Sequence, residues 1–308
     1  MTEYVFGPVP SRRFGRSLGV NPIPMKVCNY SCVYCQLGRT KNLQIERKKY
    51  FETKDVIDSL YERISANGGI DYITFMGDGE PTLAANLGEM VSELKGLWDG
   101  KTALITNGSL LFKTDVKKDA LLFDVVSPTV AAGDEKKFRR IHRPHGKITY
   151  DLYLKGLMQF SEEYEGDLWA EVMLIRDLND DEESLLAIRD ILDRINPSRI
   201  YFNAPIRPPS EPWVKVPSQE SIERALDMFP GSIDMTEPEE GEFSTPQDSG
   251  IKALLDIAKN HPLREDQALS ILSSFIEGDE AVDLLKKLVV DNRLMTTEYG
   301  GKRFYRGT

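Results

Sequence analysis

Hydrophobic and polar positions follow two alternating periods through most of the chain. Short runs of β-branched and other apolar residues are each followed by a longer stretch in which apolar residues recur every three or four positions, as in an amphipathic helix. The runs expected to form strands are Ser17–Val20, Ile70–Phe75, Thr102–Thr106, Asp124–Val130, Trp169–Ile175 and Arg199–Asn203. The helical stretches cover residues 53–64, 86–98, 116–123, 134–141, 150–164, 180–192 and 221–229.

This alternation predicts an α/β fold with parallel strands. A helix between two strands returns the chain to the same end of the sheet, by a right-handed connection. Six strand–helix units are too few for a closed barrel of eight, so we expect an open (βα)6 partial TIM barrel. Pro128 lies in the fourth run and fits only an edge or a bulge, which leaves the end of that strand open. Gly7–Arg13 is expected to be a loop.

The composition changes after residue 230. We therefore divide the chain into a barrel at residues 1–230, an acidic linker rich in Gly, Pro and Ser at 231–250, and a small domain at 251–308. Helices are expected in this domain at 251–258, 265–273 and 280–292, and Gly300-Gly301 between two short runs is typical of a hairpin. Three helices and a hairpin predict a winged-helix-like domain, which would serve DNA binding, protein contact or domain packing.

The overall composition is that of an ordinary soluble globular protein. The 308 residues are 41% hydrophobic and 29% charged. No apolar run approaches the roughly 18 residues of a membrane span, and the first residues lack the basic start and apolar core of a signal peptide. The net charge of −10 argues against broad adhesion to nucleic acid or to anionic membranes.

Positive charge is nevertheless concentrated in the first fifty residues. Nearly all of the charged residues from position 12 to 49 are basic: Arg12, Arg13, Arg16, Lys26, Arg39, Lys41, Arg47, Lys48 and Lys49. A basic rim of this kind suits an anionic substrate or an acidic electron donor such as flavodoxin or ferredoxin. It is equally interpreted as a solvated face.

All three cysteines of the chain lie in one short segment, as Cys28-x-x-x-Cys32-x-x-Cys35. A disulfide framework takes an even number of cysteines spread along the chain. A structural zinc site needs a fourth thiolate or imidazole nearby, and the histidines lie far downstream. Three soft thiolates suit an iron–sulfur cluster, and a [4Fe–4S] cubane would keep one iron without a protein ligand. Such a site fits a reducing compartment and predicts a cytoplasmic protein; a zinc loop or three unrelated thiols are the competing interpretations.

The cysteine spacing resembles the C-x-x-x-C-x-aromatic-C motif of the radical S-adenosylmethionine (SAM) superfamily, with Tyr34 at the aromatic position. The resemblance implies that the open iron binds the amine and carboxylate of SAM. It also implies that the reduced cluster cleaves SAM to a 5′-deoxyadenosyl radical, which abstracts hydrogen from a substrate. The superfamily has the same partial barrel that the alternation of strands and helices predicts.

A second motif follows the Ile70–Phe75 strand and reads Gly77-Asp78-Gly79-Glu80-Pro81-Thr82. It resembles the superfamily's G-G-E-P-T pattern, whose backbone and acid hold the amine of SAM. Asp78 stands where that pattern usually has glycine. Without the cysteine segment upstream, the same residues would be interpreted as a Gly-Pro turn with an exposed acid.

The resemblance implies further SAM contacts at the ends of later strands. Asn107 ends the third strand as Thr-Asn-Gly, which is similar to a sequence near the SAM pocket of the molybdenum-cofactor enzyme that acts on GTP, although Asn-Gly is mostly a turn. Ser127 and Thr129 both match the hydroxyl residue that bonds the SAM ribose, with Thr129 favoured. The strand Glu171–Ile175 would line the adenine site through its backbone.

Candidates for substrate contact lie at the last strand end and on one helix. Asn203 and Arg207 would lie across the barrel mouth from the cysteines and contact SAM or substrate. Arg140, His142 and Arg143 follow the fourth strand, where they would bind a phosphate or a carboxylate or simply face solvent.

The run Gly-Pro-Val-Pro-Ser-Arg-Arg, together with Cys-Gln-Leu-Gly-Arg-Thr after the cysteines, resembles a group of uncharacterised iron–sulfur oxidoreductases allied to the tRNA wyosine-base (demethylwyosine) synthases. Those synthases carry a second cluster on additional cysteines, which this chain lacks. We expect a polymeric substrate such as tRNA or a protein, because an open barrel with a basic rim admits one. The alternative is a non-catalytic iron–sulfur sensor that binds DNA through the C-terminal domain.

Overall fold

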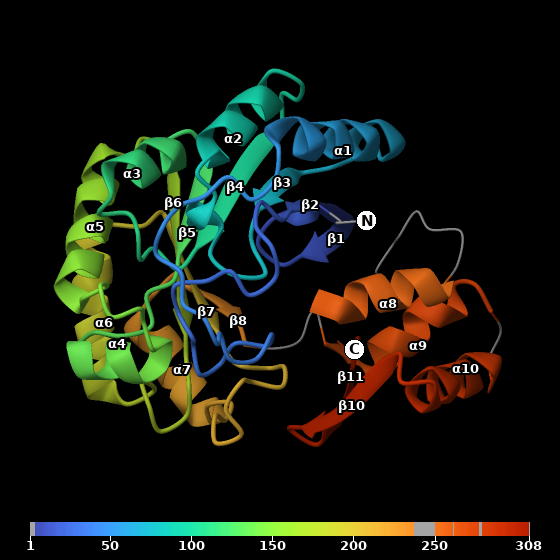
Figure 1. The fold of residues 1–308 in the computed structure, drawn as a ribbon. Coiled ribbons are helices and arrows are strands. Elements are labelled where there is room, and N and C mark those ends of the chain that lie inside the picture. Colours follow the sequence, from blue (N-terminus) through green and yellow to red (C-terminus); the bar gives the residue numbers. More distant parts are fainter. Residues whose placement is uncertain (1–3, 237–249, 261, 277–278, 308) are drawn as a thin grey trace.

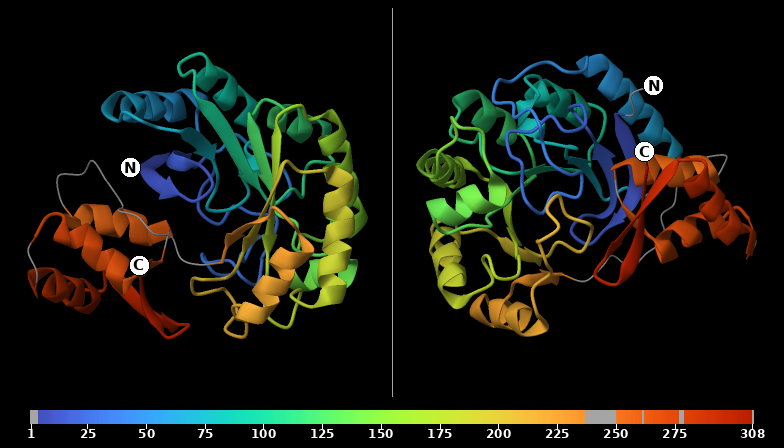
Figure 2. Two further views of the ribbon diagram at one scale, coloured as in Figure 1. Left: turned by 180° about the vertical axis from the view of Figure 1, so that it is seen from behind. Right: turned by 60° about the horizontal axis from the view of Figure 1, so that its bottom comes forward.

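The computed structural model describes residues 4–236, 250–260, 262–276 and 279–307. Within these residues the main sheet has eight strands, which follow one another in chain order. They are β1 (Val5–Ser11), β2 (Gly15–Val20), β3 (Tyr72–Phe75), β4 (Lys101–Thr106), β5 (Val125–Pro128), β6 (Asp167–Met173), β7 (Arg199–Asn203) and β8 (Ile233–Met235). β1 is antiparallel to β2, and every later pair is parallel. Figures 1 and 2 show that the sheet curls into part of a barrel with helices on its outer side.

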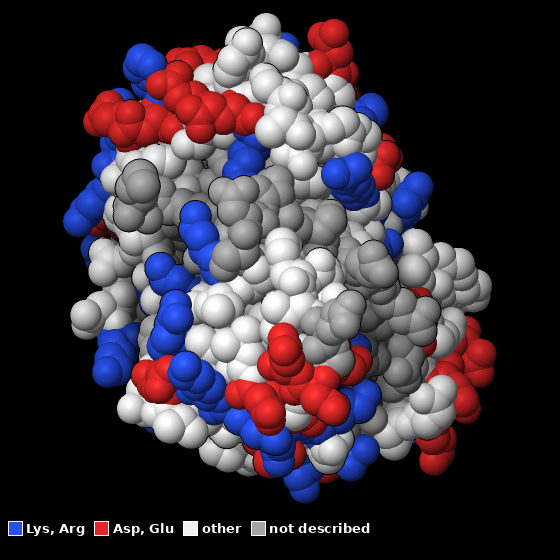
Figure 3. All heavy atoms as spheres, turned by 90° about the vertical axis from the view of Figure 1, so that its right-hand side faces the viewer, with Lys and Arg blue, Asp and Glu red and all other residues white. Residues whose placement is uncertain are grey.

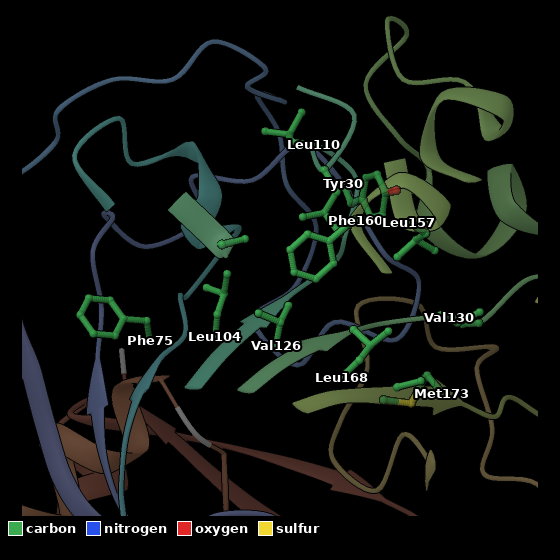
Figure 4. Close-up of a cluster of buried hydrophobic side chains, with 14 of the residues drawn as sticks. Tyr30, Phe75, Leu104, Leu110, Val126, Val130, Leu157, Phe160, Leu168 and Met173 are labelled. Atoms are coloured by element: carbon green, nitrogen blue, oxygen red, sulfur yellow. The ribbon is translucent and has the colours of Figure 1, made fainter. Parts of the chain in front are cut away.

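Helices connect the parallel strands and cover the outer face of the sheet. They are α1 (Thr53–Ala66), α2 (Leu87–Lys95), α3 (Thr114–Ala120), α4 (Glu135–His142), α5 (Tyr150–Glu163), α6 (Glu182–Ile195) and α7 (Gln219–Met228), with a 3-10 turn, η1 (Pro81–Leu83), after β3. In Figure 4, Leu104 and Val126 lie on the side of the sheet that faces Leu157 and Phe160 of α5, and Tyr30 joins this core. None of the described helices has the length and apolarity that crossing a membrane requires.

The predicted partial barrel is confirmed, and the six expected strands are present as β2 to β7. Two strands were not expected. β1 replaces the predicted loop at Gly7–Arg13, because an edge strand pairs on one side only and tolerates prolines, here with a register shift between Phe6 and Val9. β8 is only three residues long, too short for a periodic signal, and it lies inside the predicted linker. The rest of that linker, residues 237–249, is outside the described residues.

The turn between β1 and β2 folds into the barrel on the side where the strands begin. Phe14 stacks on Trp169 with ring centroids 5.3 Å apart, and its centroid is 5.2 Å from that of Tyr72, the first residue of β3. Arg13 reaches further in and places Nη1 2.6 Å from Oε2 of Glu171 in β6. The side chains of this ion pair are 12% and 11% exposed. The hairpin therefore closes the floor of the barrel.

The basic residues that the sequence predicted as one rim around the cysteines serve different parts of the fold. Arg13 is inside the barrel, and Arg12 donates to the carbonyl of Met235 at 2.6 Å, which links the two edge strands. Arg47, 9% exposed, pairs with Asp115 of α3. The face drawn in Figure 3 shows Lys and Arg side chains interspersed with Asp and Glu rather than gathered in one field. At least Arg13 and Arg47 are therefore used in internal ion pairs and do not belong to a rim around the cysteines.

The described part of residues 250–307 forms a small unit with its own sheet and core. Its elements are α8 (Gly250–Asn260), β9 (Leu263–Arg264), α9 (Glu265–Ser273), α10 (Asp279–Val290), β10 (Leu294–Tyr299) and β11 (Lys302–Gly307). The strands pair antiparallel in the order β10-β11-β9, and Leu254, Ile271 and Leu285 are among the core residues. Figures 1 and 2 show this unit beside the open side of the barrel. Arg306 Nη2 donates to the carbonyl of Leu37 at 3.3 Å and so joins it to the cysteine segment.

Candidate functional site

A pocket of about 300 Å³ lies where the parallel strands end. Because the carboxyl ends of parallel strands share one edge, loops far apart in the chain meet there. The pocket is lined by these residues predicted from the sequence: Cys28, Cys32, Tyr34, Cys35, Gly77, Asp78, Gly79, Glu80, Asn107, Thr129, Asn203 and Arg207. Pro81 and Ser127 are not among its lining residues. The cysteine segment and the Gly-Asp-Gly-Glu loop thus face one cavity.

Each cysteine sulfur meets a hydrogen-bond donor. The backbone N–H of Tyr30 lies 3.4 Å from Cys28 Sγ. The Lys26 ammonium is 3.5 Å from Cys35 Sγ and donates to the Gly38 carbonyl at 2.6 Å. Nδ1 of His142 is 3.4 Å from Cys32 Sγ. These donors favour sulfur atoms that carry negative charge, as metal-bound thiolates do.

All three cysteines are partly sheltered from solvent, and burial favours the protonated form of two of them, Cys28 and Cys32. Burial raises the pKa of Cys28 to about 12 and raises that of Cys32 well above its ordinary value. All three are free cysteines. Binding to iron requires thiolates, so loading the site releases protons.

The donor set fits an iron–sulfur cluster. Three thiols of one short segment line the same cavity, and soft thiolates are the ligands that such clusters take. Within the described residues, no three His, Cys, Asp or Glu side chains converge to hold one metal ion. A cubane does not require such convergence, because it binds each thiolate through a different iron.

The sequence predicted that His142 would bind a phosphate or a carboxylate or face solvent. In the structure it is buried beside Cys32. Its side chain is 1% exposed and is packed against Tyr30 and Phe138, with ring centroids 5.0 and 5.4 Å away. Burial lowers the pKa of His142 to about 3, so the ring is neutral at pH 7 and carries one N–H. A metal-bound Cys32 has no proton to give, so Nδ1 carries the hydrogen of this contact.

The carboxylate of Glu80 is held inside the protein rather than pointed at a ligand. It is 1% exposed and accepts four hydrogen bonds. Oε1 accepts from Thr82 N at 3.1 Å, Thr82 Oγ1 at 2.6 Å and Thr106 Oγ1 at 2.6 Å; Oε2 accepts from Asn107 N at 2.8 Å. Burial raises the pKa of Glu80 and these bonds oppose the shift. Glu80 therefore joins the ends of β3 and β4 and fixes the loop that a ligand amine would meet.

The glycine before Glu80 allows two loops to touch. A Cβ on Gly79 would lie 1.9 Å from the carbonyl oxygen of Val27, at the start of the cysteine segment. The Glu80 N–H donates to that oxygen at 2.9 Å, and the Lys26 N–H donates to the Asp78 carbonyl at 2.7 Å. Only glycine permits this approach, so the loop and the cysteine segment are built as one unit.

Asp78 stands where the superfamily pattern usually has glycine. It lines the cavity and is hydrogen-bonded to the residue that follows β2. Its Oδ2 accepts from Asn21 Nδ2 at 2.7 Å. Burial raises the pKa of Asp78, while the hydrogen bond from Asn21 and the nearby ammonium of Lys259 in α8 lower it. The carboxylate thus lies between the end of β2 and the C-terminal unit.

The structure separates the two hydroxyl candidates. Thr129 lines the pocket, and its N–H donates to the Thr106 carbonyl at 3.1 Å. Ser127 lies deeper, 1% exposed, where its Oγ accepts from Arg13 Nη1 at 3.2 Å. Pro81 begins the turn η1 and is buried. Of the two candidates, Thr129 lines the pocket, and Ser127 is bonded to Arg13 in the barrel floor.

A segment that we call the strap, residues 204–214 between β7 and α7, crosses the cysteine segment from outside. Ser210 Oγ donates to the Cys32 carbonyl at 2.8 Å, and the Glu211 N–H donates to the Val33 carbonyl at 3.2 Å. Arg207, at the pocket wall, has Nη1 3.4 Å from Gln36 Oε1. Hydrogen bonds from Arg39 and Arg143 lower the pKa of Glu211.

Sequence reasoning missed Thr106, Glu211, the side-chain role of Glu171 and the role of His142. Each acts through a partner distant in the chain, such as Glu211 with Arg39, so neither spacing nor periodicity marks it. The one local signal was polarity inside a strand. Glu171 sits in the apolar run Trp169–Ile175, where a charged residue needs a buried partner, and Arg13 is that partner.

Comparisons with known proteins agree with this geometry. A family model described as the radical SAM superfamily matches residues 23–187. A UPF0026 protein of Methanocaldococcus jannaschii is 41% identical over 97% of this chain and 94% of its own length. The fold is similar to that of a radical SAM methyltransferase from Sphaerobacter thermophilus, with TM-score 0.55 and 17% identity over 73% of this chain and 67% of that one. It is also similar to Streptococcus suis SuiB bound to S-adenosylmethionine, with TM-score 0.52 and 15% identity over 70% of this chain and 49% of SuiB.

Proposed function

This chain belongs to the radical SAM superfamily and to its UPF0026 group, and we propose that Cys28, Cys32 and Cys35 hold the [4Fe–4S] cluster at which it cleaves SAM. The observation that carries the assignment is that these cysteines and the Gly77–Glu80 loop line one pocket. When bound, the cluster supplies one electron to SAM, which yields methionine and a 5′-deoxyadenosyl radical that abstracts a hydrogen atom from the substrate.

The chain's own residues position and shelter this chemistry. Glu80 fixes the loop whose backbone would receive the SAM amine, and Asn107 continues the same wall. Thr129 and Asn203 line the same pocket, and we expect them to contact the ribose and the rest of SAM. The apolar side chains of Ile105 and Met173 keep water from part of the cavity, which protects a radical from side reactions.

The direct test is anaerobic reconstitution followed by SAM cleavage. About four irons per chain are expected, with 5′-deoxyadenosine and methionine released on addition of SAM and dithionite. The Cys32→Ala variant is expected to lose both the full iron content and the release of 5′-deoxyadenosine. Zinc in place of iron, or a fully loaded protein that releases no deoxyadenosine, would contradict the proposal.

We further propose a bulky substrate, tRNA or a protein, that presents one small group to the pocket. A pocket of about 300 Å³ that also receives cluster and SAM favours a substrate that inserts one small group. The C-terminal unit adds contact area beside the opening, where Arg306 meets Leu37. The test compares RNA and protein fractions by mass spectrometry after incubation with SAM, reductant and either the wild type or Cys32→Ala. A change confined to a small metabolite would overturn this part.

The sequence also resembled a group allied to the tRNA wyosine-base synthases, and a shared reaction with those synthases has little support. The motif that carried it, Gly7–Arg13, forms β1 and the turn in which Arg13 pairs with Glu171. A role in closing the barrel accounts for these residues without a tRNA-specific reaction. The test is whether tRNA from cells without the protein lacks a modified base that wild-type tRNA contains.

The winged-helix prediction and the sensor alternative have one supporting observation, the element order α8-β9-α9-α10-β10-β11. Against DNA binding, Arg303 of the hairpin is paired with Glu265 and Glu298 rather than presented to a phosphate. A mobility-shift assay discriminates between the sensor and the enzyme. It uses the full chain, with and without its cluster, and upstream DNA of the source organism. Specific, salt-sensitive binding would support the sensor, and its absence leaves the enzyme.

A further inference from the structure

Three arginines and a tryptophan gather on the outside of the cysteine segment. We call this group, Arg39, Arg140, Arg143 and Trp213, the arginine–tryptophan surface. Arg39 donates to both carboxylate oxygens of Glu211, at 2.6 and 2.8 Å, and Arg143 pairs with the same carboxylate. The guanidinium carbon of Arg140 lies 5.8 Å from the Trp213 ring centroid. These contacts make one continuous patch from α4 to the strap.

The patch is exposed and carries net positive charge. The side chains of Arg39 and Arg143 are 64% and 39% exposed, and Trp213 is 43% exposed, whereas the Glu211 side chain is 4% exposed. Three guanidinium groups against one carboxylate leave two positive charges. In the part of the chain that the structure describes, no carboxylate forms an ion pair with Arg140. The whole chain carries −10, so this patch differs in sign from the molecule around it.

The patch lies directly behind a cysteine but outside the pocket. Glu211 is bonded to the Val33 carbonyl, and its neighbour Ser210 to the Cys32 carbonyl. None of the four residues of the surface lines the pocket. The surface therefore borders the cysteine segment without lining the pocket that would receive SAM and substrate.

We propose that the arginine–tryptophan surface is the docking site of a small acidic one-electron carrier protein of the flavodoxin class. This inference rests on the proposed function, because cleavage of SAM consumes one electron that SAM and substrate do not supply. In the step, the reduced flavin would lose one electron and a cluster held by Cys28, Cys32 and Cys35 would gain it, with no bond formed or broken. Because the surface does not line the pocket, a carrier docked there would leave the pocket free for SAM.

Charge and side-chain type both suit this partner. An acidic carrier is repelled by most of a chain of net charge −10 and attracted at one patch, which selects its orientation and raises the association rate. Tryptophan and arginine are the residues that most often carry binding energy at protein interfaces. RNA bound at the same surface is the competing outcome, which the test below distinguishes.

The test follows oxidation of flavodoxin hydroquinone by the cluster-loaded chain in an anaerobic stopped-flow instrument. The wild-type rate is expected to fall with ionic strength, and Arg140→Glu with Trp213→Ala to slow it by about tenfold or more at low salt. Arg194→Glu, a matched charge reversal on α6 with a 57% exposed side chain, should leave the rate near that of the wild type. Bleaching of the cluster by dithionite, which needs no docking, should proceed alike in all three proteins.

Equal flavin oxidation by wild type and double variant, or none by wild type, overturns the proposal. So does a labelled RNA that binds wild type and not the double variant while flavin oxidation is unchanged, since the surface then belongs to RNA. Failure of the proposed function is distinct: the loaded chain would then release no deoxyadenosine even with dithionite.

Discussion

At the scale of single residues, the donors around the cysteine sulfurs govern how readily the site takes up an electron. Nδ1 of His142 lies 3.4 Å from Cys32 Sγ, where it would donate to a metal-bound thiolate, and Lys26 Nζ lies 3.5 Å from Cys35 Sγ. Hydrogen bonds to cluster sulfurs and nearby cations stabilise the reduced form, which has one more negative charge. These two residues therefore raise the reduction potential of a bound cluster.

His142→Phe is expected to lower the midpoint potential of the cluster. Phenylalanine keeps the packing against Tyr30 and Phe138 and removes the N–H. A tenfold smaller ratio of reduced to oxidised cluster at fixed potential corresponds to about 59 mV for one electron. The measurement is a redox titration followed by electron paramagnetic resonance. His142→Asn, which retains an N–H near the same position, should lie closer to wild type; equal potentials in all three would refute the role.

Glu80→Gln is expected to destabilise the chain and weaken SAM binding while iron content stays at about four. The amide offers one acceptor where the carboxylate satisfies four donors, from Thr82, Thr106 and Asn107. The loss of unfolding free energy should be about 1–3 kcal/mol. Denaturant unfolding of the cluster-free chain and SAM titration of the loaded chain measure the two effects. Glu163→Gln, on the exposed end of α5, is the control and should change neither.

At the scale of elements, α4, the cysteine segment and the strap form one assembly. The N–H groups of Ser31 and Val33, on either side of Cys32, donate to the carbonyls of His142 and Ile141 at 3.0 and 2.9 Å. The strap bonds the other side of the same segment through Glu211. The cysteine segment is thus held by backbone bonds on both flanks and by the burial of Tyr30 and Val33 in the core, which places Cys32 without help from a bound cluster.

The contribution of Glu211 to stability should depend on pH. Its pKa is lowered below the usual 4.5, first by the hydrogen bonds from Arg39 and then by those from Arg143. A carboxyl with a depressed folded pKa stabilises the fold above its unfolded pKa and loses that contribution as the pH falls through the folded value. We therefore expect wild type to exceed Glu211→Gln in unfolding free energy at pH 7, and the gap to shrink below pH 4.5.

Denaturant unfolding of both cluster-free proteins across this range measures the gap. Glu183→Gln, in the exposed first turn of α6, is the matched control. A gap that stays constant down to pH 3 would show that Glu211 does not owe its effect to ionisation.

At the scale of the whole molecule, the hairpin of β1 and β2 connects strands across the open barrel. Phe14 fills the floor, Arg13 bonds β5 and β6 from inside, and Arg12 joins the edge strand β8. The Arg13–Glu171 pair lies beneath the pocket, where Glu171 is also a lining residue. The floor of the cavity is thus built by residues from the opposite ends of the sheet.

Arg13→Met is expected to lower the unfolding free energy by about 3–5 kcal/mol, because it leaves the buried carboxylate of Glu171 unpaired. Arg13→Met combined with Glu171→Gln should recover part of that loss, with a coupling of about 0.5–3 kcal/mol in the double-mutant cycle. Arg16→Met removes an exposed arginine of the same hairpin and should cost little. Additive single effects in denaturant unfolding would show that the pair does not act as a unit.

The C-terminal unit reaches the pocket through few contacts. Arg306 bonds the carbonyl of Leu37, and the Lys259 ammonium acts on the pKa of Asp78. Both Leu37 and Asp78 line the pocket, so this unit borders the opening at two points. A substrate that enters from this side meets residues of β11 and α8 before it meets SAM.

The sequence by itself determined what depends on residues close together in the chain. The spacing of Cys28, Cys32 and Cys35 carries the resemblance to the radical SAM superfamily, and the alternation of strand and helix periods yields β2 to β7 and their parallel order. The Asn107-Gly108 turn follows from glycine's access to positive φ, observed at +72°. Periodicity and turn chemistry depend on neighbouring residues, so they can be interpreted without knowledge of the fold.

Only the tertiary structure decided which polar groups meet across the barrel. His142 lies 110 positions from Cys32, and Glu211 lies 172 from Arg39. Arg13, predicted at the cluster end, is placed in the barrel floor because β1 turns back along β2 and carries the hairpin tip to the other edge of the strands. Such partners are fixed by the curl and register of the whole sheet. A polar side chain is drawn to whichever buried partner that geometry brings within reach, and no local pattern encodes it.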